Sequence, residues 1–211
     1  MKIRTAKKRY EDVLALSIPA HKKPLRQHMV FRILLRLLSA WDLWRTQFTY
    51  EEIDMDKLGK DEPCLILMNH SSFIDLEIAA FLMADREWHI VTTLDGFVGL
   101  DWLLPLVGCI PTKKFIPDVT LVRDMRYTVK DLKASVIMYP EASYSFDGTA
   151  TPLPDSIGKC VKLFGVPVVM IRTEGAFLRQ PLYNCLKLRK TKVSATMEYL
   201  LSPDEIKEKT A

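Results

Sequence analysis

Short apolar runs alternate with longer segments of helical periodicity along most of this chain. The runs of strand length lie at 64–68, 88–93, 109–113, 135–139, 166–172 and 191–200, and helices are predicted over 73–84, near 99–107, and over 118–133 and 155–165. This alternation predicts an α/β fold with a single mixed, largely parallel sheet flanked by helices. Ser202 and Pro203 favour the start of a last helix, but the chain stops soon afterwards at Ala211, which leaves open whether the C-terminus is truncated.

The N-terminal part of the chain has a different pattern. Residues 25–44 carry apolar side chains at helical spacing, with Trp41 and Trp44 near the end, and arginines interrupt them at Arg26, Arg32 and Arg36. So many arginines make a poor transmembrane span, whereas a basic amphipathic helix that ends in tryptophans is typical of a membrane interface. A helix that packs its apolar side on the core would have the same pattern.

We therefore divide the chain into a basic amphipathic N-terminal helical region, 1–50, that associates with a membrane, and a main domain, 51–211. At 211 residues and 48% hydrophobic composition, the chain can bury one substantial core. The second weakly polar stretch, 97–111, is too short and too broken to span a bilayer, and it either lines a lipid pocket or belongs to that core.

Charge is distributed unevenly along the chain. The formal net charge is only +4, yet the start holds Lys2, Arg4, Lys7, Lys8, Arg9, Lys22, Lys23 and Arg26. Such a patch attracts anionic surfaces, either phospholipid headgroups or nucleic acid. Because Trp41 and its apolar neighbours lie on the same segment and no nucleic-acid recognition motif accompanies the charge, we predict phospholipid and no nucleic acid as the partner.

Cysteine and histidine spacing excludes several classes of protein. The four cysteines lack CxxC spacing, which predicts reduced thiols and a cytoplasmic setting. The four histidines form no metal-ligand motif, so we predict neither a metal nor a cofactor. The absence of a Walker loop, a GxGxxG turn and a GxSxG elbow argues against nucleotide-binding enzymes and serine hydrolases.

The most informative polar cluster follows the apolar run 64–68. It reads Asn69-His70-Ser71-Ser72-Phe73-Ile74-Asp75 and leads into an apolar helical stretch. Residues five apart on a helix point about 140° away from each other, so His70 can meet Asp75 only if His70 lies in the loop and Asp75 in the first helical turn. Ser71 or Ser72 can cap that helix, and an ordinary capping box from Ser72 to Asp75 would explain the same residues without chemistry.

A second polar cluster, 139–148, follows the short run Val136 to Met138. Because ligands of open α/β sheets bind beyond the carboxyl ends of the strands, we expect both clusters to contribute to one site.

The residues of these clusters resemble the glycerophospholipid acyltransferases, the group that includes 1-acylglycerol-3-phosphate acyltransferase. The resemblance rests on four blocks in order and covers about residues 60–200. The blocks are Asn69-His70 with Asp75; Gly108 and Ile110; Tyr139-Pro140-Glu141-Ala142-Ser143-Tyr144-Ser145; and Pro167-Val168-Val169-Met170. The combination is specific, although no single block is.

This resemblance implies transfer of a fatty acyl group from acyl-CoA or acyl carrier protein to a hydroxyl of a lysophospholipid, above all 1-acylglycerol-3-phosphate, at the cytoplasmic face of a membrane. His70 and Asp75 are then the candidate catalytic residues, with the neutral imidazole as general base and Asp75 holding its tautomer. Backbone N–H groups after Ser71 would stabilise the developing oxyanion. The candidate substrate-binding residues are Lys113, Lys114, Glu141, Ala142, Ser143 and Tyr144.

Among these, Lys113 and Lys114 would face the lipid phosphate, and Glu141 would position the acceptor hydroxyl. Glu141 could equally make only local hydrogen bonds in its turn, and the two lysines could be a solvated strand end.

Departures from the family pattern leave the acceptor open. The family usually has arginines where this chain has Lys114 and Tyr144, so phosphate recognition is weaker or lies elsewhere, with Lys113, Arg123, Arg126 and Arg172 as candidates. Ala142 replaces a glycine and should exclude a positive φ unless the backbone is strained. Other lysophospholipids stay possible acceptors, and a lipid-binding relative with little turnover or a thioesterase stays an alternative function.

Overall fold

The computed structural model describes residues 21–94, 102–113, 118–179 and 188–209, together with positions 11 and 181. Seven strands of these residues form one sheet in the order β1-β7-β6-β2-β5-β3-β4. Their bounds are β1 Thr49–Ile53, β2 Leu65–Met68, β3 Trp88–Thr93, β4 Cys109–Thr112, β5 Ser135–Met138, β6 Val168–Glu174 and β7 Ser194–Leu201. Strands β6, β2, β5, β3 and β4 are parallel to one another, and β7 and β1 run the opposite way. The predicted mixed, largely parallel sheet is confirmed.

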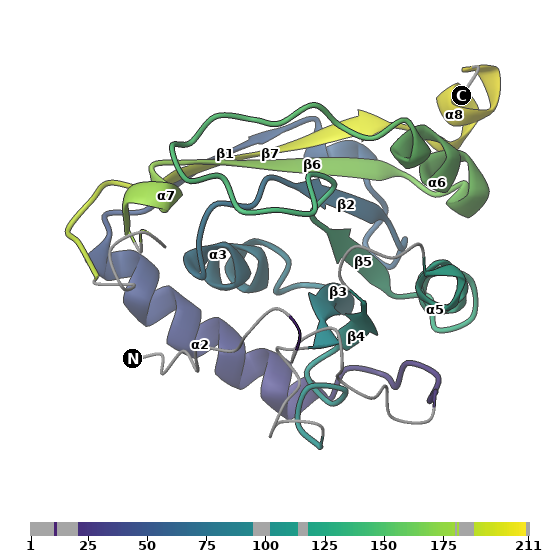
Figure 1. Ribbon diagram of the computed structural model, residues 1–211, viewed down its shortest axis with the longest axis horizontal. Coiled ribbons are helices and arrows are strands. Elements are labelled where there is room, and N and C mark those ends of the chain that lie inside the picture. Colours follow the sequence, from purple (N-terminus) through teal and green to yellow (C-terminus); the bar gives the residue numbers. More distant parts are fainter. Residues whose placement is uncertain are drawn as a thin grey trace.

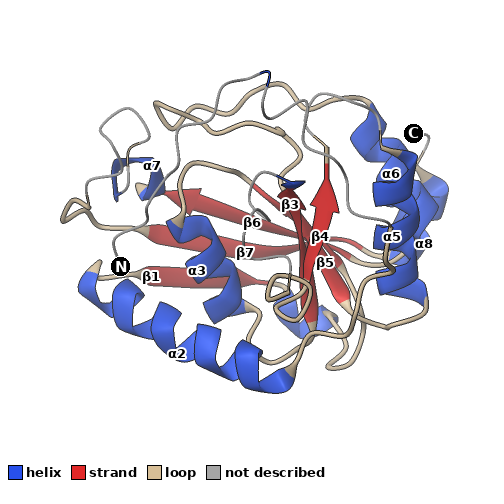
Figure 2. Ribbon diagram, turned by 60° about the horizontal axis from the view of Figure 1, so that its bottom comes forward, coloured by secondary structure: helices blue, strands red, loops and turns tan. Residues whose placement is uncertain are grey.

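Helices lie on both sides of this sheet (Figures 1 and 2). They are α2 Met29–Arg45, α3 Ile74–Leu82, α5 Val119–Lys130, α6 Ser156–Phe164, α7 Ala176–Arg179 and α8 Pro203–Glu208, with a short 3-10 helix at Met55–Lys57. Helix α3 packs against one face of the sheet and α2 packs outside α3, whereas α5 and α6 cover the other face. The predicted helix start at Ser202 is present, with its capping box and Pro203 in the first turn.

The central strand β2 shows why its sequence is a continuous apolar run. Ile66 and Met68 pack into the core cluster beneath α3, while Leu65 and Leu67 pack on the opposite face with Met125 of α5. A strand covered by helices on both faces has no polar side to alternate with.

Two elements differ from the sequence prediction. Strand β1 was not predicted, because it is an edge strand whose five residues, Thr-Tyr-Glu-Glu-Ile, are all exposed. The helix predicted near 99–107 is wrong over 102–108, which forms consecutive turns; its first residues lie outside the described part of the chain. Pro105 lies in these turns and lacks the N–H that a regular helix interior needs.

The segment that precedes α2 runs across the β3–β4 side of the sheet. The backbone N–H of His28 donates to the carbonyl of Leu106, and Arg26 forms an ion pair of 2.9 Å with Glu87. His89 Nε2 donates to the carbonyl of Leu25 at 2.8 Å. These contacts fix the start of α2 relative to the sheet.

Helix α2 has one buried side and one exposed apolar side. Leu43 and Ser39 are buried against the domain, whereas the large apolar side chains Met29, Val30, Ile33, Leu34, Leu37, Leu38, Trp41 and Trp44 are 49% to 73% exposed. The helix therefore packs on the core, as one explanation of its sequence pattern required, and it also presents an exposed apolar surface; its association with a membrane stays a prediction. Among the described helices, none is long and apolar enough to cross a bilayer.

Candidate active site

The two polar clusters meet at the carboxyl edge of the parallel strands. Asn69 and His70 follow β2, and Tyr139 follows the neighbouring strand β5. Ser145, in the second cluster, donates its backbone N–H to the carbonyl of His70 at 2.7 Å. The expectation that the clusters share one site agrees with this geometry.

His70 and Asp75 form a direct hydrogen bond of 3.0 Å between the ring Nδ1 and Oδ2 of the carboxylate. His70 lies in the loop and Asp75 in the first turn of α3, the arrangement that their spacing required. The same Oδ2 accepts the backbone N–H groups of Ser71 at 2.7 Å and Ser72 at 2.9 Å. Because Asp75 is an acceptor for these fixed donors, the Nδ1 proton belongs to His70 and the Nε2 lone pair is left available.

The start of α3 only partly follows the sequence prediction. The N-cap is Phe73, without a side-chain capping bond of its own, but the Ser72 hydroxyl accepts the N–H of Ile74, the first helical residue, at 3.4 Å. The N–H groups of Ser71 and Ser72 are engaged by Asp75, so these two do not supply oxyanion donors, and a role for the other N–H groups at the helix start stays a prediction. The carboxylate instead stabilises the turn that carries His70, since it is completely buried and near the positive end of the helix.

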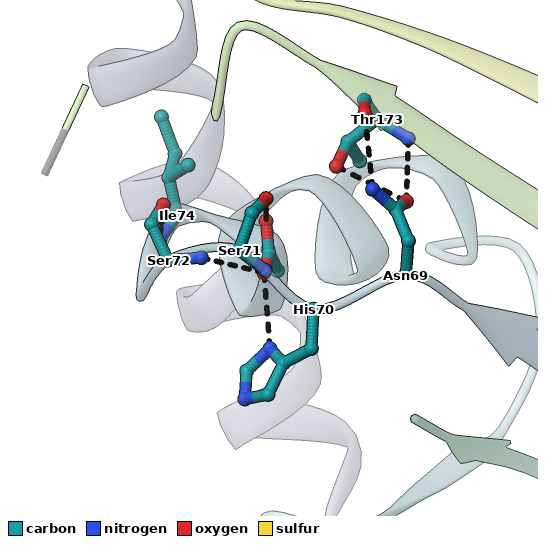
Figure 3. Close-up of polar contacts among 7 residues, drawn as sticks. Asn69, His70, Ser71, Ser72, Ile74 and Thr173 are labelled. Carbon is teal, nitrogen blue, oxygen red and sulfur yellow. Dashed lines mark hydrogen bonds and ion pairs between the residues drawn. The ribbon is translucent and has the colours of Figure 1, made fainter. Parts of the chain in front are cut away.

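Asn69 fixes the other side of this turn. Its side-chain Oδ1 accepts the backbone N–H of Thr173 at 2.7 Å and its Nδ2 donates to the Thr173 carbonyl at 3.1 Å. Asn69 and His70 project in opposite directions from the chain, so one anchors the turn to β6 and the other points into the site (Figure 3). Thr173 was not predicted, because 104 residues separate it from Asn69.

The imidazole of His70 lies between two aromatic rings. Its centroid is 3.7 Å from that of Tyr139 and 3.8 Å from that of Tyr144, with interplanar angles of 17° and 30°. Burial, and then the negative charge of Asp75, raise the pKa of Tyr139 well above its ordinary value. Its hydroxyl therefore stays protonated at neutral pH.

Glu141 makes the local hydrogen bonds that we kept as the alternative to acceptor positioning. Its Oε2 accepts from the backbone N–H of Thr151 at 3.2 Å and from the Thr151 hydroxyl at 3.0 Å. These bonds fasten the loop that carries Tyr144. Ser143 is exposed at the tip of the same turn.

Ala142 adopts the conformation that its side chain disfavours. Its φ is +53°, in the left-handed region, so the expectation that alanine excludes a positive φ is wrong and the strained alternative holds. The turn is closed by the Ala142 N–H, which donates to the carbonyl of Tyr139 at 3.0 Å. A left-handed alanine costs on the order of 1 kcal/mol.

Replacing Ala142 with glycine is therefore expected to raise the free energy of unfolding by about 0.5–1 kcal/mol, since glycine adopts this φ without strain. Denaturant unfolding of wild type and Ala142→Gly measures the difference. Ala150→Gly, in the same loop and without a positive φ, should be neutral or destabilising. A destabilised Ala142→Gly variant would show that the turn carries no such strain.

The predicted phosphate-binding residues do not gather around His70. Lys113 is exposed at the end of β4, three strands from β2 and so about 14 Å across the sheet. Lys114 lies outside the described residues. Arg123 and Arg126 are exposed on α5, and Arg172 is exposed on β6. The structure brings none of these described cations into contact with His70.

A partly buried charged cluster between α2, α3 and α7 was missed by the sequence analysis. Asp42 accepts a hydrogen bond of 3.2 Å from Arg179, and the carboxyl of Glu77 lies beside Asp42. Burial, and then the charge of Asp42, raise the pKa of Glu77 to about 8. No periodicity signals such a cluster, because its members come from three separate helices.

Glu77 should make stability fall as pH rises. A carboxyl with a raised folded-state pKa contributes stability below its unfolded value, 4.5, and loses it as the pH approaches about 8. Glutamine stays uncharged across this pH range. We therefore expect the free energy of unfolding of Glu77→Gln to equal that of wild type near pH 5 and to exceed it by about 1 kcal/mol near pH 9. Thermal unfolding of both proteins across this range is the measurement, and parallel curves would contradict the assignment.

A cavity of about 540 Å³ lies beside the end of β6, bordered by Glu174, Gly175, Lys192 and Ser194. None of the candidate catalytic residues lines this cavity, so the candidate active site is the His70–Asp75 pair and its surroundings.

Among the described residues, no group of three or more His, Cys, Asp and Glu side chains could hold a metal ion. Cys64, Cys109 and Cys160 are free thiols, and burial raises the pKa of Cys64 and Cys109 to about 11.

Comparison with known proteins places this site in a family. A family model described as Acyltransferase matches residues 47–174, more than half of the chain and all of the strand-end turns described above. The chain belongs to this acyltransferase family. The predicted resemblance to the glycerophospholipid acyltransferases is thereby confirmed, and His70 and Asp75 both lie within the matched residues.

Two relatives agree with the assignment. The chain is 30% identical over 121 residues to the chloroplastic 1-acyl-sn-glycerol-3-phosphate acyltransferase BAT2 of Brassica napus; the match covers 56% of this chain and 34% of the relative. The chain thus spans about a third of that protein's length. The crystal structure of PlsC, the 1-acyl-sn-glycerophosphate (LPA) acyltransferase of Thermotoga maritima, superposes with a TM-score of 0.64 at 16% identity, covering 82% of this chain and 69% of PlsC. At that identity the likeness shows the fold.

Proposed function

We propose that this protein is an O-acyltransferase of phospholipid synthesis that moves a fatty acyl group from acyl-CoA or acyl carrier protein to the hydroxyl of a lysophospholipid, with 1-acylglycerol-3-phosphate as the favoured acceptor. One observation carries the proposal: the His70–Asp75 hydrogen bond of 3.0 Å at the head of α3, in a chain of the acyltransferase family. The name of the Brassica relative, a 1-acyl-sn-glycerol-3-phosphate acyltransferase, supports this acceptor.

The geometry supports a general-base mechanism. With the Nδ1 proton held by Asp75, the free Nε2 of His70 takes the proton of the acceptor hydroxyl as its oxygen attacks the thioester carbonyl. The C–O bond forms, the tetrahedral intermediate collapses, and the C–S bond breaks to release the thiolate. Protonated His70 then returns the proton to the thiolate. Because a thiolate is a good leaving group, no covalent acyl-enzyme is needed.

Acceptor choice follows from the charges at the edge of the site. Lys113 is exposed at the same edge but three strands from β2, and the position where the family usually has an arginine is taken by Tyr144. We infer that phosphate binding relies on point charges of lysine type. A different lysophospholipid is the alternative acceptor.

An acceptor panel tests the proposal. Purified protein is incubated with an acyl-CoA and, in parallel, with 1-acylglycerol-3-phosphate, glycerol 3-phosphate, lysophosphatidylcholine or no acceptor, and thiol release is followed. The proposal predicts release that depends on a lysophospholipid and is fastest with 1-acylglycerol-3-phosphate. Release without any acceptor would instead indicate a thioesterase. If acyl-CoA gives no release with any acceptor, acyl carrier protein is tested as the donor, and failure of both would leave a lipid-binding protein.

Helix α2 supports a peripheral association with the cytoplasmic face of the membrane that supplies the acceptor. Its exposed side combines apolar residues and two tryptophans with the exposed Arg36 and Arg45. This composition suits insertion into the headgroup region of an anionic membrane. The helix is also part of the folded domain through Leu43, so its removal would damage the core.

Point substitutions therefore test membrane association better than a deletion. We expect Leu37→Gln with Leu38→Gln, which are 63% and 60% exposed, to weaken binding to anionic vesicles about 100-fold, because two leucines lose their burial in lipid. The matched control, Leu163→Gln with Leu200→Gln, removes two exposed leucines at the other end of the molecule. Vesicle cosedimentation measures both, and equal binding of all variants would refute the role of α2.

A further inference from the structure

Two tyrosine rings surround the imidazole of His70, and one of them, Tyr144, stands where the family usually has an arginine. Tyr139 and Tyr144 both stack on the imidazole, with centroid distances of 3.7 and 3.8 Å. Two rings this close to one imidazole cannot share a face, since they would occupy the same space. They therefore cover opposite faces, and only the edge of the His70 ring is left accessible.

The two rings of Tyr139 and Tyr144 form an aromatic clamp on His70. They come from separate parts of the chain that converge on the site. Tyr139 directly follows β5, and Tyr144 lies in the loop whose Ser145 N–H donates to the His70 carbonyl at 2.7 Å. The ring centroid of Phe73, at the start of α3, lies 6.0 Å from that of Tyr144. The ring of His70 is thus held by Asp75 at Nδ1 and by aromatic faces above and below, which leaves Nε2 as its reactive atom.

We propose that Tyr139 and Tyr144 are positioning residues for His70: they fix the plane of its ring, so that Nε2 points at the incoming acceptor, and they stabilise the imidazolium that forms when it takes the acceptor proton. The proposal rests on the function proposed above, because it assigns the two rings a role in that proton transfer. An acceptor must then approach along the edge of the ring and cannot reach its faces.

The chemistry follows from the charge distribution of aromatic rings. The face of a tyrosine ring is electronegative and attracts a cation stacked on it. The neutral imidazole gains little from this attraction, whereas the imidazolium in the transition state gains more, so the interaction raises kcat. Asp75, the charged group bonded to the imidazole in the described part of the chain, also favours the imidazolium through its negative charge.

The role needs the rings and not their hydroxyls, which makes it separable by substitution. Tyr144→Phe keeps the ring and should retain kcat within about twofold of wild type. Tyr144→Leu keeps an apolar side chain but removes the aromatic face, and we expect kcat to fall about tenfold with little change in KM. Phe146→Leu, two residues further along the loop and 62% exposed, is the matched control and should change neither constant.

The closing experiment combines these kinetics with proton NMR of the His70 ring, assigned with His70→Gln. Rings on both faces should shift its C–H resonances upfield, and Tyr144→Leu should lose part of that shift while thermal unfolding shows the variant folded. No upfield shift in wild type, a Tyr144→Leu kcat equal to wild type, or a Tyr144→Phe as impaired as Tyr144→Leu would overturn the proposal. An upfield shift in a wild type that turns over no thioester would support the clamp geometry and overturn both the proposed function and the kinetic role.

Discussion

Replacing His70 with glutamine is expected to lower kcat by about 10³-fold while the protein stays folded. The loss follows because glutamine cannot take a proton at neutral pH, and a positioned general base contributes about 10²–10⁴-fold to such a rate. The side chain of His70 is 18% exposed and its removal breaks one hydrogen bond to Asp75, so stability should change little. Thiol release at saturating donor and acceptor measures the rate, and circular dichroism and thermal unfolding check the fold.

A second histidine of the same sheet provides a matched control for His70→Gln. His89→Gln replaces another histidine that donates to a fixed acceptor, here the Leu25 carbonyl. His89 lies on β3, away from the proposed chemistry. It should retain most of the activity. If His70→Gln kept a rate close to wild type, His70 would not be the base.

The second large effect is expected for Asp75→Asn. Asp75 accepts the Nδ1 proton of His70 and the N–H groups of Ser71 and Ser72 through a single, negatively charged carboxylate oxygen. If the amide oxygen of asparagine takes the place of this oxygen, the loss of negative charge weakens the bond to His70. If the NH₂ group takes its place, donors oppose donors and the imidazole adopts the wrong tautomer. A rate loss of about 10³-fold is expected, by analogy with the loss of the orienting carboxylate in serine protease triads.

The same substitution should also lower stability by about 2 kcal/mol, because Asp75 is completely buried and leaves backbone donors unsatisfied. This cost exceeds what a simple helix-terminus charge would give. Glu77→Gln is the matched control, since it makes the same carboxylate-to-amide change on the same helix with no contact to His70, and it should keep full turnover. If Asp75→Asn and Glu77→Gln were equally active, Asp75 would be a structural residue only.

The sequence predicted those parts of the molecule that depend on local patterns. The apolar runs located β2 and β5, because strands buried on both faces carry no polar positions, and the polar residues directly after them identified the site. The spacing of His70 and Asp75 was enough to place one in a loop and the other in the first turn of α3, as the structure has them.

Other features depend on contacts that no local pattern reports. The bond from Asn69 to Thr173 and the stacking of Tyr144 on His70 join segments that are distant in the sequence. The engagement of the Ser71 and Ser72 N–H groups depends on the orientation of one side chain. The positive φ of Ala142 opposed its residue type, since a turn closed by its own N–H imposed the strain.

The exposed edge strand β1 shows a further limit. Its sequence, Thr-Tyr-Glu-Glu-Ile, has little apolar character, and it joins the sheet through parallel pairing with β7. Backbone hydrogen bonding can complete a sheet at its edge without burying side chains, so hydrophobic patterning does not detect such a strand.

The most direct test of the account is a comparison of the lipid product formed by wild type and His70→Gln. Each is given an acyl-CoA and 1-acylglycerol-3-phosphate, and the diacylated product is quantified by mass spectrometry alongside thiol release. The account predicts equal amounts of thiol and phosphatidic acid from wild type, and neither above background from His70→Gln. Phosphatidic acid formed at similar rates by both proteins would contradict the assignment of His70 as the base at the centre of this site.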